Sequence, residues 1–217
     1  MRAAGTAPGL RRFLTPRTDA GTECCELCSL ELGPGHRHLV DVEQRSLACA
    51  CQACAVLFDR PGAGGGRFRT VPDRYLTDPA WQADPVRWQA LQIPVDMAFF
   101  FRNSALERLV ALYPSPAGAT ESEVQQDAWD AVFGDSPLAH ELQPDVEALL
   151  VRRTDHGDTC HLVPVDAAYQ LVGRLRMHWQ GFDGGALVHR EVDAFFDDLN
   201  RRAQAVTATA GEGGNVP

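Results

Sequence analysis

The sequence predicts an α+β protein: an N-terminal metal-binding unit of the treble-clef or zinc-ribbon kind, followed by a mostly antiparallel sheet with packed helices. Three observations lead to this fold class. Two C-x-x-C pairs flank a predicted hairpin. Short apolar runs separated by turn residues fill the middle of the chain. The C-terminal part carries two segments whose apolar residues have helical spacing.

Changes in composition along the chain predict four segments. Residues 1–20 are expected to form a flexible arm, residues 21–60 the tetracysteine metal-binding unit, residues 67–202 the α+β domain, and residues 203–217 a disordered tail. The run RPGAGGG at 60–66 is rich in glycine, so we expect a hinge between the two units there.

The first unit is predicted to contain a hairpin and a short helix. Residues 38–42 (HLVDV) and 46–50 (SLACA) have strand character, and EQR lies near the turn between them. Residues 51–58 (CQACAVLF) include good helix formers, and the RPG sequence that begins at residue 60 is expected to end this helix.

Five strands are predicted in the second unit. Apolar or alternating runs bounded by turn residues indicate them, and the run DMAFFFRNS is so apolar that we expect its strand to be buried. The predicted strands are 67–71, 96–104, 106–114, 146–153 and 159–165.

Three helices are predicted after or between these strands. The run 119–133 begins with a capping box from Thr120 to Glu123 and continues with apolar residues at helical spacing. YPSPAGATES, at 113–122, would then be a rigid loop before a capped helix. The face of the helix at 166–179 consists of Ala168, Leu171, Val172, Leu175 and Trp179. The face of the helix at 186–203 consists of Val188, Val192, Phe195, Phe196 and Leu199.

The two C-x-x-C pairs predict a metal site. Cys25 and Cys28 before the hairpin, with Cys51 and Cys54 after it, can bring four thiolates to a tetrahedral centre, which suits zinc. Helix amides favour thiolates in the first turn, so a treble clef is preferred to a ribbon. Because four protein thiols leave no open coordination position, we expect a structural site.

Iron is the alternative metal, because a rubredoxin-type site uses the same four sulfurs. Rubredoxin pairs usually contain a proline and are followed by a glycine. Here Ser29 follows Cys28, Ala55 follows Cys54, and neither pair contains proline. Zinc is therefore favoured.

Three further cysteines and two histidines lie outside the two C-x-x-C pairs and need an interpretation of their own. Cys24 and Cys49 are expected to be bystanders, although alternative ligation or a redox pair stays open. Cys49 is expected to face away from the four-cysteine site. His36 and His38 are able to replace a sulfur, but solvent exposure or a supporting hydrogen bond is favoured. Cys160 is expected to be a buried core thiol.

Charge and composition exclude several function classes. The net charge of −9 argues against nucleic-acid binding. No apolar run is long enough for a transmembrane helix, so no membrane insertion is expected. A cytoplasmic location is expected, where thiols stay reduced. Catalytic motifs are missing, and Cys160 and His161 would point to opposite faces of a strand, so an enzyme is not favoured.

Several motifs together resemble an uncharacterised family, a domain of unknown function. They include CELC, CACQAC, IPVDMAFFF and LVPVDAAYQLVGRLRMHWQGFDGG, and the resemblance extends over about residues 9–203. Members are associated with the gene neighbourhoods of high-affinity [NiFe] uptake hydrogenases. The resemblance implies an accessory role in hydrogenase assembly, stability or electron transfer, and it supplies no catalytic residues.

The expected function is therefore that of a non-enzymatic zinc-binding accessory protein with a protein partner, a [NiFe] hydrogenase subunit or maturation factor. The alternative is a rubredoxin-like electron-transfer protein with iron in the four-cysteine site. A third hypothesis, an enzyme, would need a deep pocket with convergent polar groups near 113–122 and His178.

Overall fold

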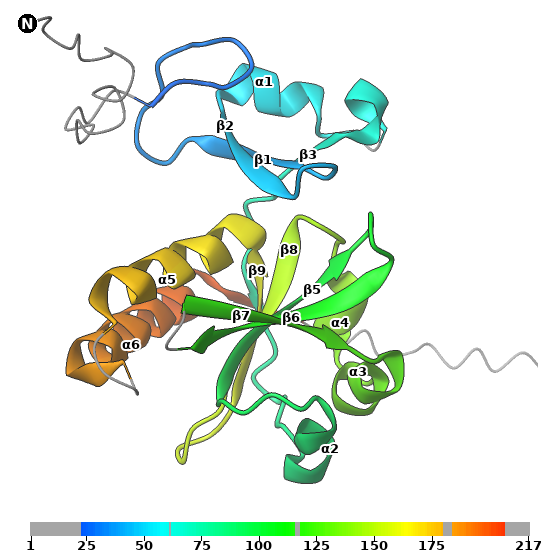
Figure 1. Cartoon of the computed structure of the whole chain (residues 1–217), viewed down its shortest axis with the longest axis vertical. Coiled ribbons are helices and arrows are strands. Elements are labelled where there is room, and N and C mark those ends of the chain that lie inside the picture. Colours follow the sequence, from blue (N-terminus) through cyan, green and yellow to red (C-terminus); the bar gives the residue numbers. More distant parts are fainter. Residues whose placement is uncertain (1–22, 61, 116–117, 180–183, 207–217) are drawn as a thin grey trace, which may run out of the picture.

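The computed structural model describes residues 23–60, 62–115, 118–179 and 184–206 (Figure 1). The flexible arm expected at 1–20 lies outside the described residues. The chain forms two sheets, one of three strands and one of seven. This arrangement confirms the predicted α+β class with a mostly antiparallel sheet.

The first sheet is built on the predicted hairpin. Strands β1 (Arg37–Asp41) and β2 (Ser46–Ala50) pair antiparallel, with His38 opposite Cys49. The predicted short helix follows as α1 (Gln52–Leu57). Leu39, Ala48 and Ala50 pack beneath it in a small core.

The third strand of this sheet lies beyond the expected boundary between the two units. The sequence predicts strand β3 (Phe68–Thr70) in the second unit, but it pairs antiparallel with β1. The glycine-rich run forms a 3-10 turn, Ala63–Gly66, in which Gly64 and Gly65 have positive φ. This turn reverses the chain, and the sheet continues beyond the expected hinge. Arg67 then binds Asp41 at 2.6 Å. We call residues 23–71 the metal lobe and residues 72–206 the main lobe.

The seven-stranded sheet of the main lobe has the order β10-β4-β9-β8-β5-β6-β7. All neighbours pair antiparallel except β10 and β4, which are parallel. Four of the predicted strands are confirmed here as β5, β6, β8 and β9. The bounds are β4 (Leu76–Thr77), β5 (Met97–Asn103), β6 (Arg108–Ser115), β7 (Gly118–Val124), β8 (Glu147–Arg152), β9 (Thr159–Pro164) and β10 (Gln204–Ala205).

Strand β7 shows that the predicted capping box was wrong. The residues from Gly118 to Val124 pair with β6 in continuous register, with Tyr113 opposite Thr120. The helix α3 (Gln126–Phe133) starts only afterwards, and its N-cap, Gln125, makes no side-chain cap bond. Cross-strand hydrogen bonds with β6 replace the helix that local spacing predicted. Residues 113–115 and 118–122 therefore lie in paired strands and not in a loop before a helix.

Helices cover both faces of the large sheet (Figure 1). The two predicted C-terminal helices are confirmed as α5 (Val165–His178) and α6 (Gly185–Arg202), and they pack on one face. Three short helices cover the other face: α2 (Pro85–Ala90), α3 and α4 (Pro137–Glu141). Successive side chains of β5 separate accordingly, Phe99 toward α5 and α6 and Phe100 toward α3.

The first residues of the tail expected at 203–217 pair with the edge of the large sheet. Strand β10 joins the sheet edge, where Gln204 donates to the Tyr75 carbonyl at 2.9 Å and Val206 to that of Thr77 at 2.9 Å. These backbone bonds depend on a distant strand, so local composition gives no signal for them. The remainder of the predicted tail lies outside the described residues.

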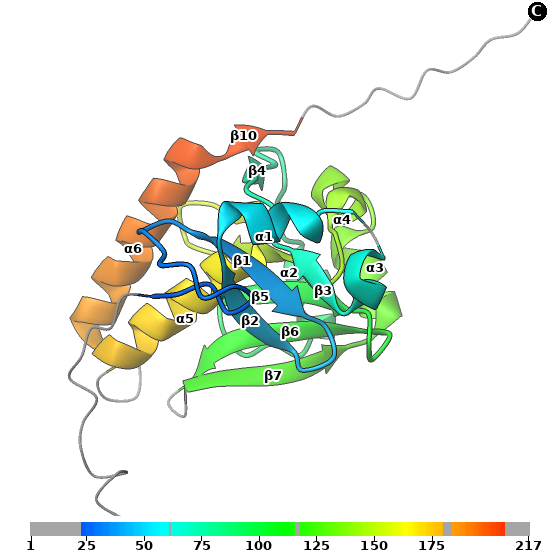
Figure 2. The same ribbon diagram turned by 90° about the horizontal axis from the view of Figure 1, so that it is seen from above.

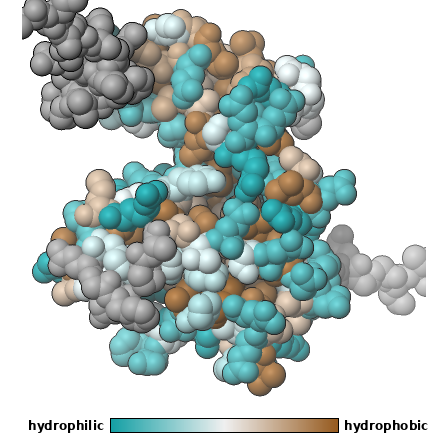
Figure 3. Space-filling model, viewed as in Figure 1, coloured by the Kyte–Doolittle hydropathy of each residue, from teal (hydrophilic) through white to brown (hydrophobic). Residues whose placement is uncertain are grey.

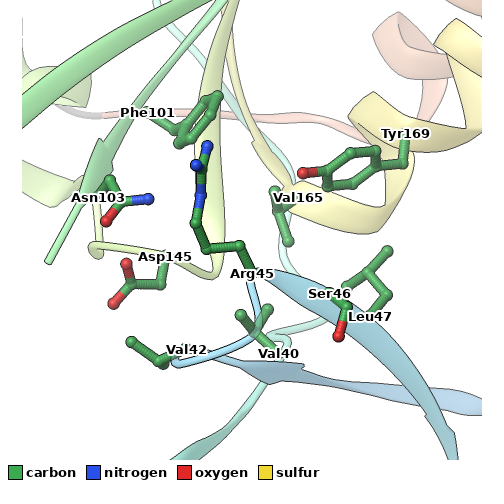
Figure 4. Close-up of a pocket in the computed structure, with 10 residues that line it drawn as sticks. All are labelled: Val40, Val42, Arg45, Ser46, Leu47, Phe101, Asn103, Asp145, Val165 and Tyr169. Atoms are coloured by element: carbon green, nitrogen blue, oxygen red, sulfur yellow. The ribbon is translucent and has the colours of Figure 1, made fainter. Parts of the chain in front are cut away.

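The two lobes meet through the outer face of β1 and β2 (Figures 1 and 2). Four buried valines form the centre of this contact, Val40, Val71, Val146 and Val165. Beside them lies a cavity of about 40 Å³, too small for an organic ligand, with Arg45 and Phe101 on its wall (Figure 4). Figure 3 shows that the lobes are joined at a narrow waist. Among the described residues, no helix has the length and apolar character needed to cross a membrane.

Candidate metal centre

A tight turn presents the first two cysteines of the centre. Within it, the Cys25 amide donates to the Leu30 carbonyl at 2.8 Å, and the Ser29 amide donates to the Cys25 carbonyl at 2.7 Å. Ser29 closes the turn with a φ of 61°, in the left-handed region that glycine usually occupies. The turn holds Cys25 and Cys28 on the same side of the loop as α1.

The second pair sits at the start of α1. Cys51 is the N-cap residue, and its sulfur accepts a hydrogen bond from the Cys54 amide at 3.4 Å. Cys54 lies one turn later, because three residues separate neighbours on a helix face. A cysteine turn, a hairpin and a helix that supplies the last two thiols form the treble-clef arrangement preferred from the sequence.

The four sulfurs are close enough to share one ion. All four lie within 4.8 Å of one another, and the sulfurs of Cys28 and Cys51 are 3.7 Å apart. A tetrahedral zinc site with bonds of about 2.3 Å has sulfur–sulfur edges of about 3.8 Å. The group can therefore hold a metal ion with little rearrangement. The same geometry suits iron, so it does not determine which metal binds.

The four thiols differ in their burial and in the hydrogen bonds that they make. Cys25 and Cys51 are buried, whereas Cys28 is exposed. Burial alone would raise the pKa of Cys25, but the amides of Cys51, Leu27 and Cys28 outweigh it and lower that pKa to about 6. Sharing hydrogen bonds with Cys28 and Cys51, and burial, raise the pKa of Cys54 to about 12. Cys25 is thus prepared as a thiolate, whereas Cys54 loses its proton only when a cation binds.

The other three cysteines lie outside the four-cysteine group. Cys49 is on β2 opposite His38, and its sulfur is not one of the four. Cys24 forms an isolated bridge with Glu31 beside the cysteine turn. Cys160 is fully buried in the main core, as expected.

His36 and His38 are the residues whose surroundings the sequence missed. One nitrogen from each ring and the Cys49 sulfur lie within 4.8 Å of one another. His38 Nδ1 also lies 2.8 Å from Asp166 Oδ2, on α5 of the main lobe. The alternation H-x-H before a paired cysteine could have indicated the shared face, but no local pattern points to Asp166.

The polar groups considered for catalysis are separated. Cys160 packs into the core, and His161 on the other side of β9 bonds through Nε2 to Asn200 Oδ1 at 3.0 Å. Burial lowers the pKa of His161 and so disfavours the charged form of the ring. Near 113–115 there is a cavity of about 600 Å³, but it is mainly lined by apolar side chains such as Met97 and Val192. The same wall also carries polar side chains, among them Asp96, Arg152 and His189.

Fold and site define a class: a treble-clef centre with four cysteines, attached to a seven-stranded sheet with helices on both faces. The chain belongs to a family of unknown function (DUF5947), whose model matches residues 24–203. No curated protein and no solved structure matches the chain.

Proposed function

We propose that this protein is a zinc-binding accessory protein of the cytoplasm that has no catalysis of its own. Zinc in the four-cysteine centre would hold the metal lobe in shape, and the folded chain would bind a protein partner. A [NiFe] hydrogenase subunit or maturation factor is the proposed partner, on the basis of the family resemblance. The observation that carries the proposal is the set of four thiols gathered at one point.

A structural role for the metal follows from the size of the metal lobe. Its own core contains only six buried residues, two of which are Cys25 and Cys51 themselves. So small a core buries too little apolar surface to offset the entropy of folding. Zinc binding would supply that free energy, as it does in other small metal-bound folds.

Exposed apolar side chains on the metal lobe support a binding role. Leu27 and Leu30 lie in and beside the cysteine turn, with exposed fractions of 39% and 57%. Val56 and Leu57 on α1 are exposed to 59% and 68%. These four exposed apolar side chains within one small lobe form the surface that we propose the partner covers.

Metal analysis tests the first half of the proposal. Protein expressed with sufficient zinc and iron should hold zinc in the four-cysteine centre, at least one equivalent per chain, and be colourless. Cys51→Ser should lose that zinc, whereas Cys160→Ser, which changes a buried thiol far from the centre, should retain it. A chain that holds no metal, or one whose metal content is the same in both variants, would contradict the proposal.

Direct binding tests the second half. Purified hydrogenase subunits and maturation factors should form a complex with the zinc-loaded protein. The double variant Val56→Glu/Leu57→Glu should weaken this complex at least 10-fold. Val86→Glu is the matched control, because Val86 is 77% exposed on α2 of the main lobe. Failure of every hydrogenase component to bind, with maturation unchanged on deletion, would overturn the proposed partner.

Electron transfer is the second candidate, and the exposure of Cys28 favours it. A thiolate at the surface would let an iron in this centre exchange electrons with a partner. Iron bound by four thiolates is strongly coloured. A visible spectrum of protein expressed with adequate iron therefore separates the two candidates, and a colourless protein with one zinc rules this one out.

A further inference from the structure

A second group of metal-binding side chains lies on the other face of the β1–β2 hairpin. His38 and Cys49 face each other across the hairpin, and His36 precedes His38 by two residues, on the same side. The Cys49 sulfur and one nitrogen of each ring lie within 4.8 Å of one another. The two rings are tilted, with centroids 4.8 Å apart. These three residues are separate from the four-cysteine centre.

Hydrogen bonds on the far side of both rings determine which nitrogen is available. His38 Nδ1 donates to Asp166 Oδ2 at 2.8 Å, and His36 Nδ1 donates to the Gly33 carbonyl at 3.2 Å. Both bonds leave Nε2 as the nitrogen with a free lone pair. Histidines that bind metals commonly have such a carboxylate or carbonyl partner, which fixes the tautomer and the ring orientation.

His36 supplies independent support. Its side chain is only 10% exposed, and its Nε2 is buried without a hydrogen-bond partner among the described residues. A buried polar atom without a partner costs free energy, so such atoms in folded proteins usually bind something. A cation next to the His38 ring and the Cys49 sulfur would satisfy this nitrogen.

We propose that His36 Nε2, His38 Nε2 and Cys49 Sγ form a second metal site that takes a divalent ion of the zinc type. Two imidazoles and one thiolate are the donors that such borderline ions prefer. A tetrahedral site with these donors has ligand separations of about 3.3–3.6 Å, shorter than the 4.8 Å within which the three groups lie, so a bound ion would draw the side chains together.

The second site differs from the first because it leaves a coordination position open. His36 and His38 line a cleft of about 650 Å³ between β1 and α5, together with Tyr75, Gln170 and Arg202. With three protein ligands, the fourth position would hold water or another small ligand from the cleft. Closed four-ligand sites are typical of structural zinc, and open three-ligand sites are typical of sites that exchange ligands. The second site does not depend on the proposed function, because the experiment measures the metal bound at each of the two centres separately.

Cobalt(II) is a suitable probe, because a cobalt–thiolate bond gives an absorption band that a zinc–thiolate bond does not give. Fully reduced protein, already loaded with one zinc, should bind one further equivalent of Co²⁺, with a sulfur-to-cobalt absorption band and unchanged zinc content. His36→Gln/His38→Gln should lose this second equivalent and keep the zinc. Cys49→Ser should lose the absorption band. His156→Gln, which changes an exposed histidine in the main lobe, should behave like the wild type.

Asp166→Asn keeps all three ligands and tests the hydrogen bond between Asp166 and His38 Nδ1. We expect it to weaken Co²⁺ binding by roughly 10- to 100-fold, the usual effect of removing such a partner. Retained zinc in each variant shows that the metal lobe is folded. The proposal is overturned if wild-type protein binds no second equivalent, or if the double histidine variant binds it as tightly as the wild type.

Discussion

Ser29 shows how a single backbone conformation contributes to the metal centre. It follows Cys28 at the position where rubredoxin-type pairs carry glycine. The absence of glycine there favours zinc over iron in the four-cysteine centre. The structure nevertheless gives Ser29 the left-handed conformation of that glycine, with a φ of 61°. The turn geometry is thus kept, and a side chain pays about 1 kcal/mol or more in steric strain.

We predict opposite effects of glycine and valine at this residue. Ser29→Gly should relieve strain and stabilise the zinc-bound lobe by about 1 kcal/mol, whereas Ser29→Val should destabilise it by a similar amount. Competition with a chelator measures the apparent zinc affinity of each variant. Ser122 is the control, because it lies in strand β7 and should prefer valine to glycine. The same preference at both positions would contradict this account.

At the scale of elements, Arg74 joins parts of the main lobe that are distant in sequence. It precedes β4 and binds the fully buried Glu147 of β8 at 2.6 Å, and it also reaches Glu141 of α4 at 3.0 Å. The hydrogen bond to Glu147 is the main reason that the pKa of Arg74 is raised. The Gln143 amide also donates to Glu147. The buried carboxylate therefore depends on Arg74 for its opposite charge.

Removing Arg74 should be costly. Arg74→Ala leaves the Glu147 charge buried without its partner, and we expect it to lower the free energy of unfolding by about 3 kcal/mol. Arg201→Ala removes an exposed pair with Asp198 and should cost less than about 1 kcal/mol. Urea unfolding of both variants measures the difference. If both variants lowered the free energy of unfolding by the same small amount, Glu147 would not require the opposite charge of Arg74.

At the scale of the whole molecule, two cores of unequal size are joined at a waist. The main lobe has large clusters on both faces of its sheet, whereas the metal lobe has a small cluster that includes its own cysteines. The valines between the lobes and the pair of Arg69 with Asp145 connect them. Stability should therefore differ between the lobes, and the metal should matter mainly to one of them.

We predict that a chelator unfolds the metal lobe and leaves the main lobe folded. Amide hydrogen exchange should lose protection in β1 and β2 once the metal is removed, because the core beneath them then lacks its main support. Protection in β5 and β8, at the centre of the large sheet, should persist. Added zinc should restore the lost protection. If both lobes lost protection together, the lobes would form one cooperative unit.

Local pattern in the sequence was enough for much of the fold and for the four-cysteine group. The hairpin, α1, the strands β5, β6, β8 and β9, and the helices α5 and α6 all follow from apolar spacing and turn residues. The C-x-x-C pairs identify thiols that the hairpin then brings together. Each of these features is encoded within a few consecutive residues, since side-chain spacing selects helix or strand and decides which face is buried.

The tertiary structure alone decided which distant segments pair. It made residues 118–124 a strand beside β6, gave β3 to the metal lobe, and drew β10 onto the sheet edge. It also brought Asp166 to His38, across 128 positions of sequence. Spacing fixes the face on which His36, His38 and Cys49 lie, but only packing of the two lobes determines what that face meets. Choice of partner is a property of the whole chain, because it depends on all the surfaces that compete to be buried.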